Sequence, residues 1–198
     1  MRMKVGGNMR KIKEELKKIL SQKRYDHSIG VAEVAKKLAK IYKEDEKRVE
    51  TAALLHDCAK NFKLEDMKRL IHREEKISEE MKELPEILHG FAGAIYARNM
   101  FRIEDEQILK AIKYHTIGRK NMSMLEKIIY IADVIEPSRK CKNVDKVRKL
   151  AYIDINKAIL QEVKNKISYL LSTERVIHKN TIEMRNYILM KEKGMKNG

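Results

Sequence analysis

The sequence is poor in residues that break helices or cross-link chains. Its 198 residues include two prolines, eight glycines, two cysteines, three phenylalanines and no tryptophan. Lysine, glutamate, leucine, isoleucine and alanine are abundant by contrast, so the composition favours helix almost throughout. No segment shows the sustained apolar–polar alternation of a half-buried strand. We therefore expect an all-α fold, and the length suits a single domain.

Two further absences exclude whole classes of protein. Cys58 and Cys141 lie far apart and form no Cys-x-x-Cys pair, which argues against a disulfide framework and against a thiolate zinc site. No apolar run approaches the ~18 residues of a membrane span, and no signal-peptide pattern precedes a small-residue cleavage site. The sequence thus predicts a cytoplasmic protein with no membrane partner.

Apolar periodicity predicts a succession of helices within one helical domain, residues 9–193, between an extension at 1–8 and a frayed tail at 194–198. We expect Asp45 to be an N-cap and Ser123, with Glu126, to form a capping box. Pro85 is expected to mark a turn. The first predicted helix covers residues 9–22. The second is opened by residues 24–28 and continues to Tyr42, and the third leads from Asp45 to His56. The remaining predicted helices cover residues 64–71, 78–84, 91–99, 104–115, 123–136, 143–151, 154–171 and 173–192.

The chain is strongly basic, with a net charge of +15 and a pI near 9.7. Residues 139–198 carry +9 of this charge. Such a surface attracts polyanions, either nucleic acid or a small phosphate-rich molecule, but it also fits a solvated, lysine-rich exterior. Charge alone does not decide between these interpretations.

The chemistry of the chain centres on polar residues inside apolar runs. The run Ala52-Ala53-Leu54-Leu55 leads directly into His56 and Asp57. Burying an ionised carboxylate beside an imidazole is costly unless a partner satisfies both, and a metal cation does so. Taken alone, however, the dipeptide is more simply interpreted as a hydrogen-bonded pair at a helix end.

Four more residues change this interpretation. Asp133 lies in the apolar run 128–135, His115 extends an apolar helix face, and His27 and His89 lie at or near expected helix ends. The spacings from His27 to His56, Asp57 to His89, His89 to His115 and His115 to Asp133 are 29, 32, 26 and 18 residues. Each spacing is about one helix-loop-helix step, so successive helices can bring one ligand each to a common centre. Imidazole and carboxylate ligands without thiolates suit Fe, Mn, Zn or Mg.

These residues stand in five stretches, Arg24-Tyr25-Asp26-His27-Ser28, Ala53-Leu54-Leu55-His56-Asp57-Cys58-Ala59-Lys60, Leu88-His89-Gly90, Tyr114-His115-Thr116-Ile117-Gly118 and Tyr130-Ile131-Ala132-Asp133-Val134-Ile135-Glu136-Pro137-Ser138-Arg139, with a sixth at 177–186. Together they resemble the HD-domain superfamily of metal-dependent phosphohydrolases, and more closely its bacterial symmetrical bis(5′-nucleosyl)-tetraphosphatases. The resemblance runs from about Met9 to Tyr187. It implies an HD-domain helical bundle with a metal site between its helices.

The resemblance also implies a reaction and roles for individual residues. The reaction would be hydrolysis of diadenosine tetraphosphate and related dinucleoside polyphosphates to two ADP by metal-activated water, with Asp57 and Lys60 as catalytic residues. The first metal would be held by His27, His56, Asp57 and Asp133. Iron is the favoured metal, with Mn, Zn and Mg as alternatives. His89 and His115 would hold a second ion or contact the phosphate. The implied nucleotide contacts are Arg24, Gly30, Lys60, His89, His115, Thr116, Arg139, Thr181 and Arg185.

Some interpretations stay open at this point. Residues 140–143 replace an aromatic and a Pro-Gly turn usual in the family, and Lys179 replaces a proline, which leaves base preference open. The same metal site would also suit a nucleotidase or an alarmone or cyclic-nucleotide phosphohydrolase. A third alternative is a basic RNA-binding module with a structural metal, disfavoured because aromatics are not interleaved with the basic residues. The number of ions and a homodimeric assembly are left open as well.

Overall fold

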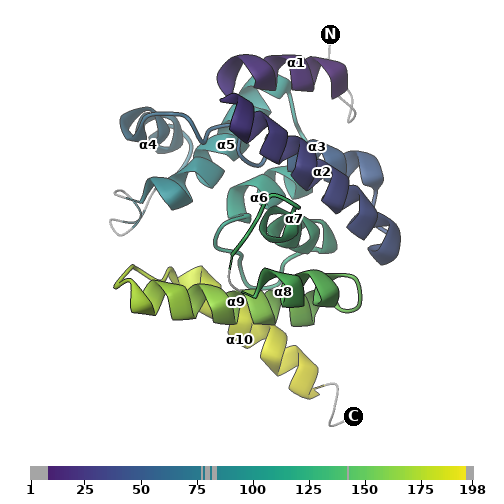
Figure 1. Ribbon diagram of the computed structural model, residues 1–198. Coiled ribbons are helices and arrows are strands. Elements are labelled where there is room, and N and C mark those ends of the chain that lie inside the picture. The colour runs from purple at the N-terminus through teal and green to yellow at the C-terminus, as the bar shows by residue number, and fades with distance from the viewer. Residues whose placement is uncertain (1–8, 77, 79–80, 82–83, 142, 195–198) are drawn as a thin grey trace.

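A computed structural model describes residues 9–76, 78, 81, 84–141 and 143–194. Within these residues the chain contains helices and turns but no β-strand, which confirms the expected all-α fold. The helices, labelled in Figure 1, are α1 (Met9–Ile19), α2 (Gln22–Tyr42), α3 (Glu46–Leu55), α4 (Leu64–His72), α5 (Pro85–Phe101), α6 (Glu106–Tyr114), α7 (Met124–Ile135), α8 (Val144–Ala151), α9 (Ile155–Ser172) and α10 (Lys179–Gly194).

The predicted caps begin their helices as expected. The side chain of Asp45 accepts hydrogen bonds from the backbone N–H groups of Lys47 and Arg48, at 2.8 and 3.0 Å. Ser123 accepts from the Glu126 backbone while the Glu126 carboxylate accepts from the Ser123 N–H, the reciprocal bonds of a capping box. Each cap satisfies N–H groups that have no partner within the helix.

Three expected boundaries are wrong. Pro85 is not in a turn: it occupies the first turn of α5, where a missing N–H costs nothing, so His89 lies within that helix. Residues 24–28 do not open a helix, because α2 already begins at Gln22 and places Arg24 and His27 one turn apart. The last helix begins at Lys179 rather than at residue 173.

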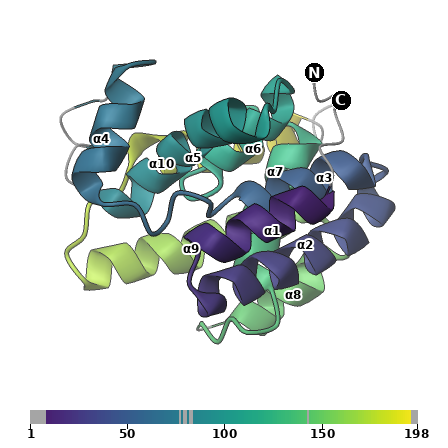
Figure 2. The same cartoon turned by 90° about the horizontal axis from the view of Figure 1, so that it is seen from above.

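Helix α7 lies at the centre of the molecule, and its residues from Ile128 to Ala132 are fully buried. It packs against α2, α3 and α6 on one side and against α8 and α9 on the other. Figure 1 shows these as layers above and below α7, with α10 leaving the lower layer. Helix α1 lies above α2 at the top of the molecule in Figure 1, and Figure 2 looks down on these two helices. Because other helices cover α7 on both sides, its residues are apolar nearly all round the helix. The carboxylate of Asp133 therefore lies among apolar neighbours.

Several expectations fall outside the described residues. These are the extension at 1–8, much of the predicted helix 78–84 and the tail beyond Gly194, which is itself the last residue of α10. Among the helices of the described part, none has both the length and the apolar character needed to cross a bilayer.

Candidate metal centre and adjoining cleft

The structure brings all six predicted ligands together from five helices. His27 comes from α2, His56 and Asp57 directly follow α3, His89 comes from α5, His115 directly follows α6 and Asp133 comes from α7. Three groups each have candidate ligand atoms within 4.8 Å of one another: His27, His56 and Asp57; His56, His115 and Asp133; and Asp57, His89 and His115.

Backbone carbonyl groups orient two of the imidazoles. Nδ1 of His56 donates to the carbonyl oxygen of Ala53 at 2.6 Å, and Nδ1 of His115 donates to that of Ile112 at 2.7 Å. Both bonds reach back into the last turn of the preceding helix. In a neutral imidazole that donates through Nδ1, the lone pair lies on Nε2, which is the atom that can bind a metal.

His56 provides the clearest test of whether the site fits a cation. Its side chain is fully buried, and Nε2 has no hydrogen-bond partner among the described residues. Carboxylate oxygens of Asp57 and Asp133 lie 3.7 and 3.8 Å from this nitrogen. Burial lowers the pKa of His56 to about 4, so the imidazole is neutral at pH 7. A neutral lone pair facing two carboxylates is unfavourable unless a cation lies between them, so these residues fit a metal.

The two aspartates have the charge that such a site requires. Burial alone would raise the pKa of Asp133, but its contact with Nε2 of His27 and the charge of Arg139 outweigh burial and hold that pKa well below its usual range. Nε2 of His27 lies 2.9 Å from Asp133 Oδ1. In the same way, neighbouring histidines outweigh burial and lower the pKa of Asp57. Both carboxylates are therefore ionised at neutral pH.

A second cluster lies on the other side of Asp57. Nε2 of His89 is 3.0 Å from Nε2 of His115 and 3.1 Å from Asp57 Oδ1. The ammonium of Lys60 lies 3.3 Å from Nδ1 of His89. Burial is the main cause of the lowered pKa of Lys60. Asp57 is thus shared between two sets of imidazoles, which is the arrangement needed for a carboxylate that bridges two ions.

Two arginines approach the carboxylates from the rim. NH1 of Arg24 donates to Asp57 Oδ2 at 2.9 Å, and NH2 of Arg139 donates to Asp133 Oδ1 at 2.5 Å. About a third of the Arg24 side chain and two fifths of the Arg139 side chain remain exposed. Both guanidinium groups can therefore meet a phosphate at the mouth of the site.

Glu136 is an additional residue of the site, with no role predicted from the sequence. Its Oε1 accepts a hydrogen bond from Nδ1 of His27 at 3.1 Å, and its carboxylate also accepts from Ser138. Gly30 leaves room for this carboxylate, because a Cβ there would lie 3.1 Å from Glu136 Oε2. The available signal was its position three residues after Asp133, one helical turn away.

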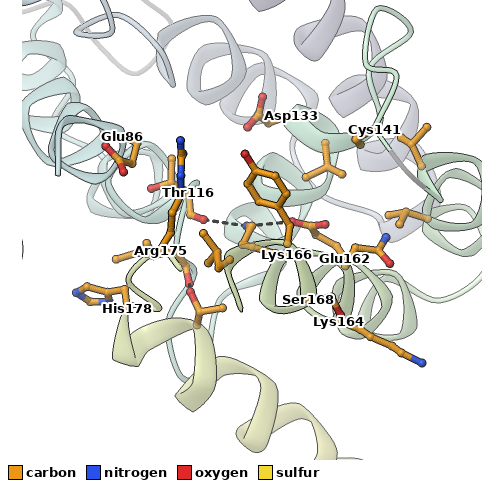
Figure 3. A pocket seen from close by; sticks show the side chains of 18 of the residues that line it. Glu86, Thr116, Asp133, Cys141, Glu162, Lys164, Lys166, Ser168, Arg175 and His178 are labelled. Carbon is orange, nitrogen blue, oxygen red and sulfur yellow. Dashed lines mark hydrogen bonds and ion pairs between the residues drawn. The ribbon is translucent and has the colours of Figure 1, made fainter. Parts of the chain in front are cut away.

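A cleft of about 1100 Å³ opens beside the centre, slightly above the ~300–1000 Å³ of most small-molecule sites. It extends along α9, as Figure 3 shows. Basic side chains outnumber acidic ones along its walls. The predicted site residues that line it are Lys60, His115, Thr116, Asp133, Arg139 and Thr181.

Three of the predicted nucleotide contacts have other neighbours. The hydroxyl of Thr181 lines the cleft but donates to the carbonyl oxygen of Ile117 at 3.0 Å. Arg185 is exposed, with NH1 3.3 Å from the side-chain oxygen of Asn186. Gly30 faces Glu136 rather than the cleft. The structure therefore brings neither Arg185 nor Gly30 to the cleft walls.

The comparisons with known proteins agree with this geometry. The model of the HD domain matches residues 24–138, which include every predicted metal ligand. The chain belongs to the HD-domain family. A symmetrical bis(5′-nucleosyl)-tetraphosphatase of Halalkalibacterium halodurans is 43% identical over 94% of this chain and 100% of its own length. One from Bacillus subtilis is 40% identical over 88% and 94%.

A solved structure shows that the HD-domain fold extends beyond the matched region. It is the crystal structure of a predicted HD superfamily hydrolase involved in NAD metabolism from Clostridium acetobutylicum. The two chains are 44% identical, with a TM-score of 0.90 covering 93% of this chain and 98% of the other. Helices α8 to α10 therefore belong to the same HD-domain protein architecture as the metal centre.

Proposed function

We propose that this HD-domain protein hydrolyses diadenosine tetraphosphate symmetrically to two molecules of ADP, with a divalent metal as cofactor. The observation that carries the proposal is the convergence of six imidazole and carboxylate ligands beside a basic cleft. Relatives that match this chain over nearly their full length are symmetrical bis(5′-nucleosyl)-tetraphosphatases. The cleft is large and basic enough to suit a substrate with four consecutive phosphates.

In this proposal His27, His56, Asp57 and Asp133 hold the first ion, and His89 and His115 hold a second or contact the phosphate. When bound, such an ion lowers the pKa of a coordinated water toward ~7 and supplies hydroxide at neutral pH. The ligands favour metal binding through their protonation states. Asp57 is ionised and His56 is neutral, so neither has to lose a proton before the ion binds. We infer iron as the metal from the resemblance alone, because imidazole and carboxylate ligands without thiolates suit Mn, Zn and Mg as well.

The basic residues of the rim are proposed to bind and orient the phosphates. Lys60 lies beside His89 at the wall of the cleft, where its ammonium can balance charge growing on phosphoryl oxygens. Arg24 and Arg139 can give bidentate contacts to phosphates on either side of the scissile bond. Symmetrical cleavage follows if the terminal phosphate of one ADP half is the group held beside Asp57.

Product analysis tests the proposal directly. Purified protein loaded with Fe²⁺ or Mn²⁺ is incubated with diadenosine tetraphosphate in H₂¹⁸O, and the nucleotides are separated by ion exchange and weighed by mass spectrometry. We expect ADP alone, with one ¹⁸O atom for every two ADP molecules. ATP plus AMP, or no turnover, would refute the proposal.

Parallel incubations separate the alternatives. Turnover of a guanosine alarmone or a cyclic dinucleotide faster than of diadenosine tetraphosphate would favour another HD-domain phosphohydrolase. Asp57→Asn provides the matched control, because it keeps the size of the side chain but removes a charged ligand; we expect it to lose turnover. RNA binding that is salt-dependent and survives Asp57→Asn, without any turnover, would favour the RNA-binding alternative.

A further inference from the structure

Lys166 of α9 is not one of the predicted site residues, and its side chain ends in a cluster of polar groups. Its ammonium donates to the hydroxyl oxygen of Tyr130 at 2.8 Å and to the carbonyl oxygen of Thr116 at 3.0 Å. It also forms an ion pair with Glu162 at 3.0 Å. A lysine ammonium has three donors, so these three partners can use all of them.

Two of these partners are next to metal-centre residues. Thr116 directly follows His115, and Tyr130 precedes Asp133 by three residues, one turn of α7. His115 and Asp133 belong to one of the three potential metal-binding groups. Figure 3 shows Lys166 between Thr116 and Glu162 in the cleft. One ammonium thus connects α9 to both the loop that follows His115 and the helix that carries Asp133.

The neighbours of the Lys166 ammonium stabilise its positive charge. Tyr130 is fully buried, and its ring centroid lies 4.5 Å from the Lys166 ammonium. Burial opposes the charge, but Tyr130 and Glu162 outweigh it and raise the pKa of Lys166. Such a network is stable when every member is paired, and loss of one member leaves the others as costly unpaired groups. Its geometry is therefore narrowly defined.

We propose that Lys166 is a positioning residue for the hydrolytic reaction: by holding Thr116 and Tyr130 at one point, it sets the separation of His115 and Asp133. This proposal rests on the proposed function. The side chain acts through its neighbours and touches no reacting atom. Loss of the ammonium should let the segment 115–121 shift relative to α7, which misplaces His115 without removing any ligand.

Lys166→Met tests this, with Lys127→Met as a matched control. Lys127 also joins α7 to α9, because its ammonium donates to the side-chain oxygen of Asn156 at 2.8 Å, and neither residue adjoins a predicted metal ligand in the sequence. Tyr130→Phe removes one acceptor with little change of shape and covers the case in which Lys166→Met folds poorly. The measurements are kcat and KM for diadenosine tetraphosphate at equal metal content, and amide hydrogen exchange of residues 115–121.

We expect Lys166→Met to lower kcat at least tenfold with less than a threefold change in KM, and to speed exchange of 115–121 at least fivefold. Tyr130→Phe should move both in the same direction by less, and Lys127→Met should leave both within twofold of wild type. Unchanged kcat and exchange in Lys166→Met, or equal effects in Lys127→Met, would overturn the proposal. A wild-type protein without turnover would refute the proposed function only, and the exchange of 115–121 would then decide the role of Lys166.

Discussion

Replacing Gly118 by alanine should destabilise the protein, because two constraints meet at this residue. Its φ of +65° lies in the left-handed region, and an added Cβ would overlap Sδ of Met184 and lie 2.7 Å from its Cε. The left-handed conformation costs alanine about 1–2 kcal/mol, and crowding in a packed core costs about 1–3 kcal/mol. Alanine also lowers the conformational entropy of the unfolded chain, which stabilises the folded protein by about 0.4–1 kcal/mol. The net loss in the free energy of unfolding should be roughly 1–5 kcal/mol.

Urea denaturation measures this loss as a lower midpoint at an unchanged m-value. Gly93→Ala is the matched control: Gly93 lies within α5, and its added Cβ would meet Ile112 and Cys58 at ordinary contact distances of 3.4 and 3.5 Å. We expect that variant to be within about 1 kcal/mol of wild type. In a double-mutant cycle, Met184→Ala should relieve the crowding, so the combined loss is smaller than the sum. A loss below about 0.5 kcal/mol for Gly118→Ala would refute the reasoning.

Two further predictions concern the metal centre. Glu136→Ala removes the acceptor that orients His27 and should weaken metal binding about 10–100-fold in a chelator competition assay, whereas unchanged affinity would exclude this role. In the metal-free protein, burial lowers the pKa of His56 and of His89 to about 4. The unfolded chain binds protons to these imidazoles below about pH 6.5 while the folded protein does not, so stability should fall as the pH drops from about 6.5 to 4. His89→Gln should flatten this decline in urea midpoints, and a flat wild-type profile would contradict the pKa shifts.

The ligand set could be predicted because its members are polar residues within or next to apolar helical stretches. Asp133 is a carboxylate inside the continuous apolar run of α7, and His56 and Asp57 directly follow the buried helix α3. Their spacing of about one helix-loop-helix step follows from the fold, in which successive helices reach one centre. Local pattern and tertiary structure agree at these positions.

Lys166 and Glu136 could not be assigned roles in the same way. Lys166 lies in a basic helix among other lysines, and only its packing against Tyr130 and Thr116 distinguishes it. Glu136 contacts His27, which lies 109 residues earlier in the sequence, so the contact depends on the tertiary fold. The error at Pro85 has a different cause, since proline favours both turns and the first turn of a helix, and flanking residues did not separate the two.

The central claim is that the imidazole and carboxylate cluster holds the metal on which hydrolysis depends. Elemental analysis of protein purified without chelator, performed on wild type and His56→Ala and paired with turnover of diadenosine tetraphosphate, tests it most directly. We expect one to two transition-metal ions per wild-type chain, and loss of metal and turnover together in His56→Ala. Full turnover by wild type stripped of metal, or retention of both metal and turnover in His56→Ala, would contradict it.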